Sequence, residues 1–338
     1  MSSYPSQEEV KAFQEPLLAF REGLGKVLFG QDSLIDHVIM ALLAGGHVLL
    51  EGLPGLGKTE LIKGMAVSLG ADFRRIQFTP DLLPSDITGF QLFNAKDNED
   101  GFKFQKGPLF AQLVLADEIN RASPKTQSAM LEAMQEKSVT MAGITHKLPR
   151  PFFVMATQNP IELEGTYPLP EAQLDRFLFK LPIEMVSRKA MEMIIRHRDL
   201  GESPDLEKVM DMEHLLSAMD TCRRIYLPDP VVEAVSALVE LAQPGSQGAG
   251  RWLRHGSGPR AALALTAALR AKALLAGRIN ASTEDIPAIV PHVFRHRLIL
   301  RPEARMENHT IEGVINDLLQ ELKSSFRSLP ETLTEANA

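Results

Sequence analysis

Strand-like apolar runs alternate with stretches of helical periodicity over residues 25–183. The runs are VLL at 48–50, FRRIQF at 73–78, LVLA at 113–116, FFVMAT at 152–157 and FLFKLP at 177–182. Such alternation is typical of a parallel sheet with helices on its faces, so it predicts an α/β core. Before this core, residues 7–24 have the periodicity of one amphipathic helix, within a predicted N-terminal segment, 1–24.

After the core only helical patterns remain, so residues 184–338 are predicted to form a helical domain. Its clearest helix is the Ala/Leu-rich run 260–276, with Pro259 in the first turn and Gly277 just past the end. The last fifteen or so residues are polar and are expected to fray.

Two stretches within the core are predicted to be β-hairpins. Residues 89–110 place alternating apolar residues on both sides of the polar turn AKDNEDG, 95–101. Residues 138–148 alternate in the same way and turn at Ala142 and Gly143. The tip of the first hairpin is acidic and that of the second is apolar, so neither predicts a grip on nucleic acid phosphates.

Composition narrows the class of protein. The 338 residues include 44% hydrophobic and 23% charged residues, which is ordinary for a globular protein of about two domains. A net charge of −7 disfavours general binding to nucleic acid or to anionic membranes. The single Cys222 fits a reducing compartment. With no leader pattern and no apolar run long enough for a bilayer, we expect a cytoplasmic protein.

The stretch GLPGLGKT, residues 52–59, follows the first strand-like run and matches the spacing G-x-x-x-x-G-K-[ST]. Gly55 and Gly57 allow the backbone N–H groups to curl around phosphate oxygens, and the following helix adds its positive end. Lys58 would then pair with the β and γ phosphates and Thr59 would coordinate Mg²⁺. The alternative is a glycine-rich turn without a ligand. The predicted cofactor-binding set of this loop is Gly52, Pro54, Gly55, Gly57, Lys58, Thr59 and Glu60.

A second motif, QLVLADEIN, delivers two adjacent carboxylates at the end of a predicted buried strand. Ligands bind outside the carboxyl ends of parallel strands, so this pair can meet the phosphate loop. Asp117 is the candidate Mg²⁺ ligand, and Glu118 is the candidate general base for an attacking water. An apolar run followed by Asp-Glu is, on its own, weak evidence for a Mg–ATP site, because the ends of surface strands often carry such pairs.

Five ordered motifs together give a specific resemblance. They are GLPGLGKT, LADEINRASPKTQSAMLEAMQE, ATQNP, EAQLDRF and GPRAALAL, and they resemble the MoxR family of AAA+ ATPases from about Val27 to Leu300. The resemblance implies a P-loop NTPase fold, in which a parallel five-stranded sheet flanked by helices is followed by an all-helical lid. It also places VLFGQ, with Gly30 and Gln31, near the adenine of ATP.

The resemblance assigns further site residues. Asn159 matches the sensor that hydrogen-bonds the γ-phosphate or the water, although an Asn-Pro pair is also a common turn. Arg176 matches the arginine finger that enters a neighbouring subunit's site. Its alternative is a surface ion pair with an adjacent acid. Arg260 matches the lid's sensor arginine, acting on its own nucleotide or the neighbour's, and Arg121 is a candidate for the subunit interface.

These assignments imply an ATP-hydrolysing motor that works as a ring, most plausibly a hexamer. By resemblance the partner is a protein with a von Willebrand factor A domain, which is remodelled, assembled or activated, with metal-cofactor insertion as one outcome. In related proteins hairpins face the central pore. Alternatives are a chelatase-type motor subunit, a nucleic-acid translocase or transcription regulator, and a nucleotide-sensing scaffold that does not hydrolyse ATP.

One pair of histidines is a candidate for metal binding. His292 and His296 lie four residues apart, on one face of a predicted helix, but no third ligand is evident. We expect instead a charged His pair stabilised by the helix C-terminus.

Overall fold

The computed structural model describes residues 4–53, 55–93, 102–160, 165–197 and 206–325. Its helices are α1 Gln7–Val27, α2 Asp32–Ala44, α3 Lys58–Leu69, α4 Pro84–Thr88, α5 Pro124–Glu136, α6 Glu171–Leu174, α7 Arg188–His197, α8 Met212–Arg224, α9 Asp229–Leu241, α10 Pro259–Leu275, α11 Ile286–Phe294, α12 Pro302–Met306 and α13 Ile311–Ser325. Its strands are β1 Val48–Glu51, β2 Phe73–Gln77, β3 Gly89–Phe93, β4 Phe102–Lys106, β5 Leu113–Asp117, β6 Ser138–Met141, β7 Ile144–Lys147, β8 Phe153–Gln158, β9 Phe179–Pro182, β10 Leu253–His255 and β11 Ile299–Leu300.

The predicted parallel sheet is confirmed. It has five strands in the order β2-β5-β8-β1-β9, and every neighbouring pair is parallel. In the register, Gln77 lies opposite Asp117, and Glu51 lies opposite Gln158. The carboxyl ends of β1, β2, β5 and β8 therefore meet along one edge of the sheet, where ligands bind in open α/β sheets.

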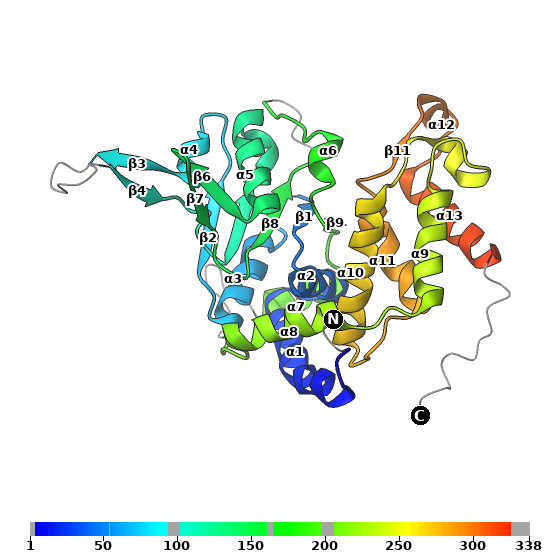
Figure 1. The fold of residues 1–338 in the computed structure, drawn as a ribbon, viewed down its shortest axis with the longest axis horizontal. Coiled ribbons are helices and arrows are strands. Elements are labelled where there is room, and N and C mark those ends of the chain that lie inside the picture. Colours follow the sequence, from blue (N-terminus) through cyan, green and yellow to red (C-terminus); the bar gives the residue numbers. More distant parts are fainter. Residues whose placement is uncertain (1–3, 54, 94–101, 161–164, 198–205, 326–338) are drawn as a thin grey trace.

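Successive side chains of each strand enter different cores. Leu49, Val114 and Val154 pack in the cluster that contains the buried face of α5. Val48 and Leu113, one residue away on the same strands, join the cluster formed with α1, α2 and α3. That second cluster continues without a break into α10, α11 and α13 of the C-terminal part. The sheet and the C-terminal helices are thus joined by continuous apolar packing. In Figure 1, α2 and α10 lie side by side where the two parts meet.

The C-terminal region is helical, as predicted. Pro259 begins α10, and Gly277 follows its end at φ +71°, which glycine adopts without steric cost. The sequence pattern did not predict the short antiparallel pair of β10 and β11 in this region. The proposed domain division after residue 183 stays a prediction, although the sheet ends at Pro182.

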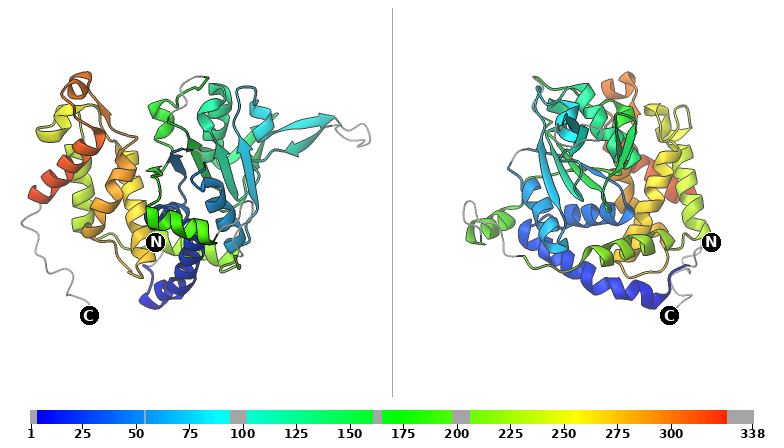
Figure 2. Two further views of the ribbon diagram at one scale, coloured as in Figure 1. Left: turned by 180° about the vertical axis from the view of Figure 1, so that it is seen from behind. Right: turned by 60° about the vertical axis from the view of Figure 1, so that its left-hand side comes forward.

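Both hairpins are confirmed. β3 pairs with β4 and stands away from the body of the molecule (Figures 1 and 2). The predicted acidic turn 95–101 lies outside the described residues, as does the C-terminal tail beyond 325. β6 and β7 turn at Ala142 and Gly143, whose φ values of 49° and 81° suit the tight turn of a two-residue hairpin. Within the described residues, no helix is both long and apolar enough to cross a membrane.

Candidate active site

The loop between β1 and α3 has a backbone that requires glycine. Gly55 and Gly57 adopt φ values of +81° and +80°. A Cβ atom at Gly57 would lie 2.6 Å from the Cδ1 atom of Leu28, which packs beneath the loop. Gly57 directly precedes α3 and provides no side-chain cap for its first N–H groups. The loop therefore ends at the uncapped, positive end of a helix, which suits an anion.

A cavity of about 390 Å³ lies over this loop and the ends of the neighbouring strands. On the loop side it is lined by Gly52, Gly55, Gly57, Lys58, Thr59 and Glu60. On the strand side it is lined by Arg75, Gln77, Asp117, Glu118, Thr157 and Asn159. The predicted amine, acid pair and amide therefore converge on one cavity.

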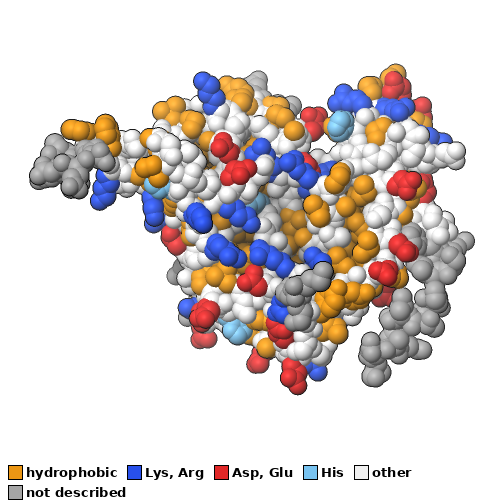
Figure 3. Space-filling model, in the orientation of Figure 1, with side chains coloured by type: hydrophobic (Ala, Val, Ile, Leu, Met, Phe, Trp, Pro, Cys, Tyr) orange, Lys and Arg blue, Asp and Glu red, His pale blue; other side chains and the backbone are white. Residues whose placement is uncertain are grey.

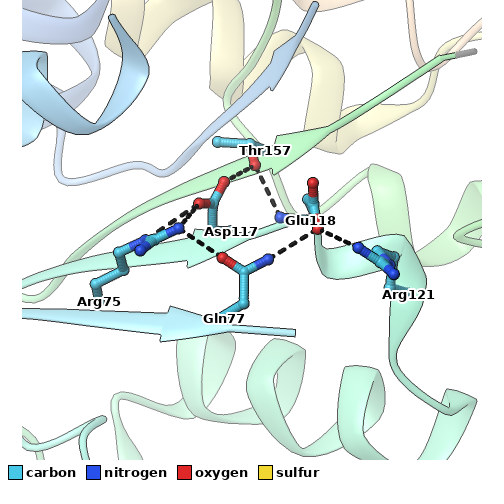
Figure 4. Close-up of polar contacts among 6 residues, drawn as sticks. All are labelled: Arg75, Gln77, Asp117, Glu118, Arg121 and Thr157. Carbon is cyan, nitrogen blue, oxygen red and sulfur yellow. Dashed lines mark hydrogen bonds and ion pairs between the residues drawn. The ribbon is translucent and has the colours of Figure 1, made fainter. Parts of the chain in front are cut away.

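Thr157 fixes the acid pair from the neighbouring strand β8. Its hydroxyl donates to Asp117 Oδ1 at 2.6 Å and accepts the backbone N–H of Glu118 at 2.8 Å (Figure 4). The hydroxyl thus contacts both members of the pair and sets their relative position. Asp117 is mostly covered, with 16% of its side chain exposed.

Glu118 has an unusual backbone for a residue with a side chain. Its φ and ψ of 56° and 50° lie in the left-handed region, which costs a non-glycine residue about 1 kcal/mol or more. The carboxylate is held in place, because Oε2 accepts from Gln77 Nε2 at 2.8 Å and from Arg121 Nη1 at 2.9 Å (Figure 4). This strained turn separates the Glu118 side chain from that of Asp117 and directs it to its own donors.

Lys58 lies half-buried in the cavity at the first position of α3. Burial lowers the pKa of its amine, and the carboxylates of Asp117, Glu118 and Glu51 oppose that effect. The Nζ atom donates to the carbonyl oxygen of Gly52 within the loop. The amine is thus held over the loop, and a cavity with this cation and a helix N-terminus can bind a polyphosphate.

The donor set fits Mg²⁺ bound together with phosphates. Asp117 and Thr59 supply hard oxygen atoms to the cavity that Lys58 also lines. Mg²⁺ is usually held by one or two carboxylates plus phosphate oxygens, and it does not need a cage of protein ligands. Consistently, the described part of the chain contains no group of three or more His, Cys, Asp and Glu residues able to hold a metal.

Several predicted residues do not line this cavity. Gln31 donates from Nε2 to the carbonyl oxygen of Glu184, and a Cβ atom at Gly30 would lie 2.7 Å from the Cβ of Ala190 in α7. Pro54 lies outside the described residues. Arg260 donates from Nη1 to Asp175 Oδ2 at 3.3 Å, so the anion beside this first-turn cation in the structure is Asp175.

Arg176 faces a different cavity. That cavity, of about 380 Å³, is lined by Ser128, Leu131, Glu132, Glu136, Gln173 and Arg176, between α5 and the α6 segment. None of these residues lines the cavity of Lys58. The alternative to the finger role, an ion pair of Arg176 with Asp175 or Glu171, does not occur among the ion pairs of the described residues. Asp175 instead pairs with Arg297 and Arg260.

Three residues of the site, Arg75, Gln77 and Thr157, were not predicted from the sequence. Arg75 and Gln77 are alternate residues of β2, so their side chains emerge on one face of the strand beside the acid pair. Thr157 stands two residues before Asn159 in the quoted ATQNP motif. Two polar residues at alternate positions of the strand-like run 73–78 were the signal available for Arg75 and Gln77.

The prediction that His292 and His296 form a charged pair at a helix C-terminus is wrong. α11 ends at Phe294, so His296 lies beyond the helix. Burial lowers the pKa of His292 to about 3, with further lowering by His37 and Arg295, and it places the pKa of His296 well below its usual value. Both rings are therefore neutral at pH 7, and the cost of burying a charge outweighs the attraction of the helix end.

Comparison with known proteins agrees with this geometry. Residues 47–179 match the family described as "ATPase family associated with various cellular activities (AAA)", and residues 251–318 match the AAA lid domain. The chaperone MoxR1 of Mycobacterium tuberculosis is 42% identical over 299 residues, which cover 87% of this chain and 78% of that protein. The chain belongs to the MoxR family of AAA+ ATPases.

Other relatives extend the match to most of the chain. The uncharacterized protein YeaC of Bacillus subtilis is 44% identical over 317 residues, covering 92% of this chain and 97% of that protein. A crystal structure from Cytophaga hutchinsonii, of a protein assigned as an ATPase, superposes with a TM-score of 0.84 at 35% identity and covers 93% of this chain and 96% of that chain. As a MoxR-family member the chain binds nucleotide and hydrolyses ATP.

Proposed function

We propose that the chain forms a ring, most plausibly a hexamer, that hydrolyses Mg–ATP and uses the energy as a chaperone-like motor on a partner protein. The observation that carries the proposal is the separation of Arg176 from the cavity of Lys58. Lys58 lines one cavity, whereas Arg176 lines another that shares no residue with the first. The Arg176 guanidinium, if it stabilises a transition state, would therefore do so in the site of a second copy of the chain.

The chemistry assigned to each residue follows from its place. Lys58 pairs with the β and γ phosphates, while Asp117 and Thr59 hold Mg²⁺, which would neutralise phosphate oxygens. Glu118, oriented by Gln77 and Arg121, polarises the water that attacks the γ-phosphate in line. Asn159, buried on the cavity wall, is placed to contact that phosphate or the water.

Arg260 is proposed to act on the neighbour's nucleotide together with Arg176. Asp175 binds Arg260 and directly precedes Arg176 in the chain, so both guanidinium groups belong to one surface. On the same helix as Arg260, Leu263 is 70% exposed, and Figure 3 shows hydrophobic side chains gathered over the region of α10. A neighbouring subunit would cover this surface, where Arg121 stays a weaker interface candidate.

Mixing two inactive chains tests the ring directly. Arg176→Ala removes the finger and leaves the cavity of Lys58 intact, whereas Lys58→Ala does the reverse. We expect each variant alone to be inactive and mixed rings to recover part of the ATPase, because some interfaces then combine an intact cavity with an intact finger. If rings shown to be mixed recover no activity at any ratio, Arg176 does not act between subunits.

The β3–β4 hairpin is the proposed contact with the partner protein. Four of its apolar side chains are exposed between 45% and 69%: Phe90, Leu92, Phe93 and Phe102. Phe93 and Phe102 lie opposite each other, with ring centroids 5.4 Å apart. Exposed aromatic pairs on a projecting strand pair are typical of interaction sites, and Figure 3 shows hydrophobic side chains along this projection.

The partner's class rests on resemblance within the family: a protein with a von Willebrand factor A domain, for activation, assembly or metal-cofactor insertion. The test is capture from a lysate with ATP and a Glu118→Gln chain, which should bind ATP without turning it over. We expect the captured protein to be lost when Phe93 and Phe102 are both replaced by Ser. The exposed Leu18 on α1, replaced by Ser, is the matched control.

Two results of ATPase measurements would redirect the proposal. Stimulation of the ATPase by DNA or RNA in a salt-dependent manner would support the translocase or regulator alternative. Dependence on a tetrapyrrole and on separate partner subunits would support the chelatase alternative. Cytoplasmic location stays a prediction, and buried Cys222 is the structural observation compatible with it.

A further inference from the structure

Arg75 reaches the acid pair from β2, the edge strand of the sheet. Its Nη2 and Nε atoms both donate to Asp117 Oδ2, at 2.7 and 3.2 Å. Nη2 also donates to Gln77 Oε1 at 2.6 Å, which links the guanidinium to the network in Figure 4. Arg75 and Lys58 line the same cavity, so the proposed nucleotide site has two cations of its own chain.

The contacts of Asp117 leave little room for another cation. Oδ2 accepts the two bonds from Arg75, and Oδ1 accepts the hydroxyl of Thr157. A divalent cation held by this carboxylate, directly or through water, would come close to a guanidinium that carries the same sign of charge. Like charges this close in a partly covered site repel strongly, so both cannot hold Asp117 in this arrangement.

We propose that Arg75 is a displaceable counter-cation of Asp117 that competes with the divalent metal for this carboxylate. The inference rests on the proposed function, because it presumes that nucleotide and Mg²⁺ share this cavity. Arg75 covers the negative charge of Asp117 when nucleotide arrives without metal, and it leaves Asp117 when the metal binds. The residue is thus a positioning residue that sets how strongly nucleotide binding depends on metal.

The exposure of the two partners supports an exchange of this kind. The Arg75 side chain is 49% exposed, whereas that of Asp117 is 16% exposed. A long, half-exposed side chain can leave toward solvent at little cost, while the carboxylate stays fixed by Thr157. Arg121 is not an equivalent candidate, because it pairs with Glu118 and not with Asp117.

Removing the guanidinium should have opposite effects on two measured quantities. Without metal, Asp117 would face the phosphates uncovered, so nucleotide would bind more weakly in Arg75→Gln. With metal, no cation would need to be displaced, so a lower Mg²⁺ concentration would suffice. A residue with a merely structural role would change both quantities in the same direction, by weakening the site as a whole.

The experiment measures binding of a fluorescent ADP analogue, first in EDTA and then as Mg²⁺ is titrated in. For Arg75→Gln we expect the dissociation constant in EDTA to rise about threefold or more, and the half-saturating Mg²⁺ concentration to fall by a similar factor. Arg75→Lys keeps the positive charge but loses the two-pronged guanidinium. Its two constants should therefore lie between those of the wild type and those of Arg75→Gln. Arg74→Gln is the matched control, because Arg74 is the adjacent residue of β2 and pairs with Asp72.

The outcomes separate this inference from the proposed function. If no chain binds the analogue under any condition, the proposed function fails. If the wild type binds it with metal dependence, but Arg75→Gln and Arg75→Lys match Arg74→Gln in both quantities, only the role of Arg75 is refuted. In an Asp117→Asn background the Arg75→Gln effect should vanish, and its persistence there would show that Arg75 acts through another group.

Discussion

Arg297 offers a test of how the C-terminal helices hold the segment that carries Arg176. Its guanidinium is 5% exposed, and its Nε donates to Asp175 Oδ1 at 2.7 Å. The remaining donors reach backbone carbonyls of Asp175, Phe177, Leu178 and Val293 at 2.6 to 3.3 Å. All five N–H groups of the guanidinium are therefore used, which only arginine can do.

The Arg297→Ala variant should lose stability and activity together. Removing one partner of a buried ion pair costs about 3–5 kcal/mol, and we expect the lower part of that range because Arg260 still pairs with Asp175. For 338 residues the unfolding entropy is about 0.7 kcal/mol/K, so the melting temperature should fall by about 4–6 °C. Below that temperature the ATPase should still be reduced, because Arg176 directly follows Asp175.

The assay is thermal unfolding followed by circular dichroism, with ATPase measured on the folded protein. Arg305→Ala, at an exposed position of α12, should shift the melting temperature by about 1 °C or less. Arg297→Lys keeps the charge but cannot reach all the carbonyls, so it should lie between Arg297→Ala and wild type. A shift for Arg297→Ala as small as that of Arg305→Ala would refute the role given to these bonds.

Three further changes have defined outcomes. Glu118→Gln should keep ATP binding but lose turnover by about two orders of magnitude or more, and near-normal turnover would remove Glu118 from its role. Gly57→Ala should abolish nucleotide binding, measured by fluorescence, because its φ of +80° is strained for alanine and its methyl group would meet Leu28. The pKa of His292, lowered by burial to about 3, lies below its unfolded value of 6.5, so its contribution to stability is present above pH 6.5 and is lost as pH falls. The loss is about 2 kcal/mol between pH 7 and pH 5 in denaturant titrations; His292→Gln should reduce this slope and exposed His255→Gln should not.

The parts of the fold that repeat a local pattern were predictable from the sequence. The five strands were found because each is a short apolar run bounded by turn residues, and α10 because Pro259 and Gly277 mark its ends. The hairpin turn at Ala142 and Gly143 follows from local turn chemistry in the same way. The short β10–β11 pair was not predictable, since strands of two or three residues have no period to detect.

The candidate site was predictable where motifs place residues at strand ends. Lys58 and Asp117 are 59 positions apart in the chain, yet both face one cavity because parallel strands end at one edge. Arg75 was missed because only the register of β2 beside β5 shows that it reaches Asp117. The location of Arg260 beside Asp175 depends on how the C-terminal helices pack on the core, which no local pattern encodes.

Calorimetry of ATP binding tests the central claim most directly: that Lys58, Asp117 and Asn159 form one Mg–nucleotide site in each chain. In a Glu118→Gln background, which prevents turnover, we expect one ATP per chain in the presence of Mg²⁺ and no measurable binding after Lys58→Ala. If no ATP is taken up, or if Lys58→Ala binds it as tightly as before, this cavity is not the nucleotide site.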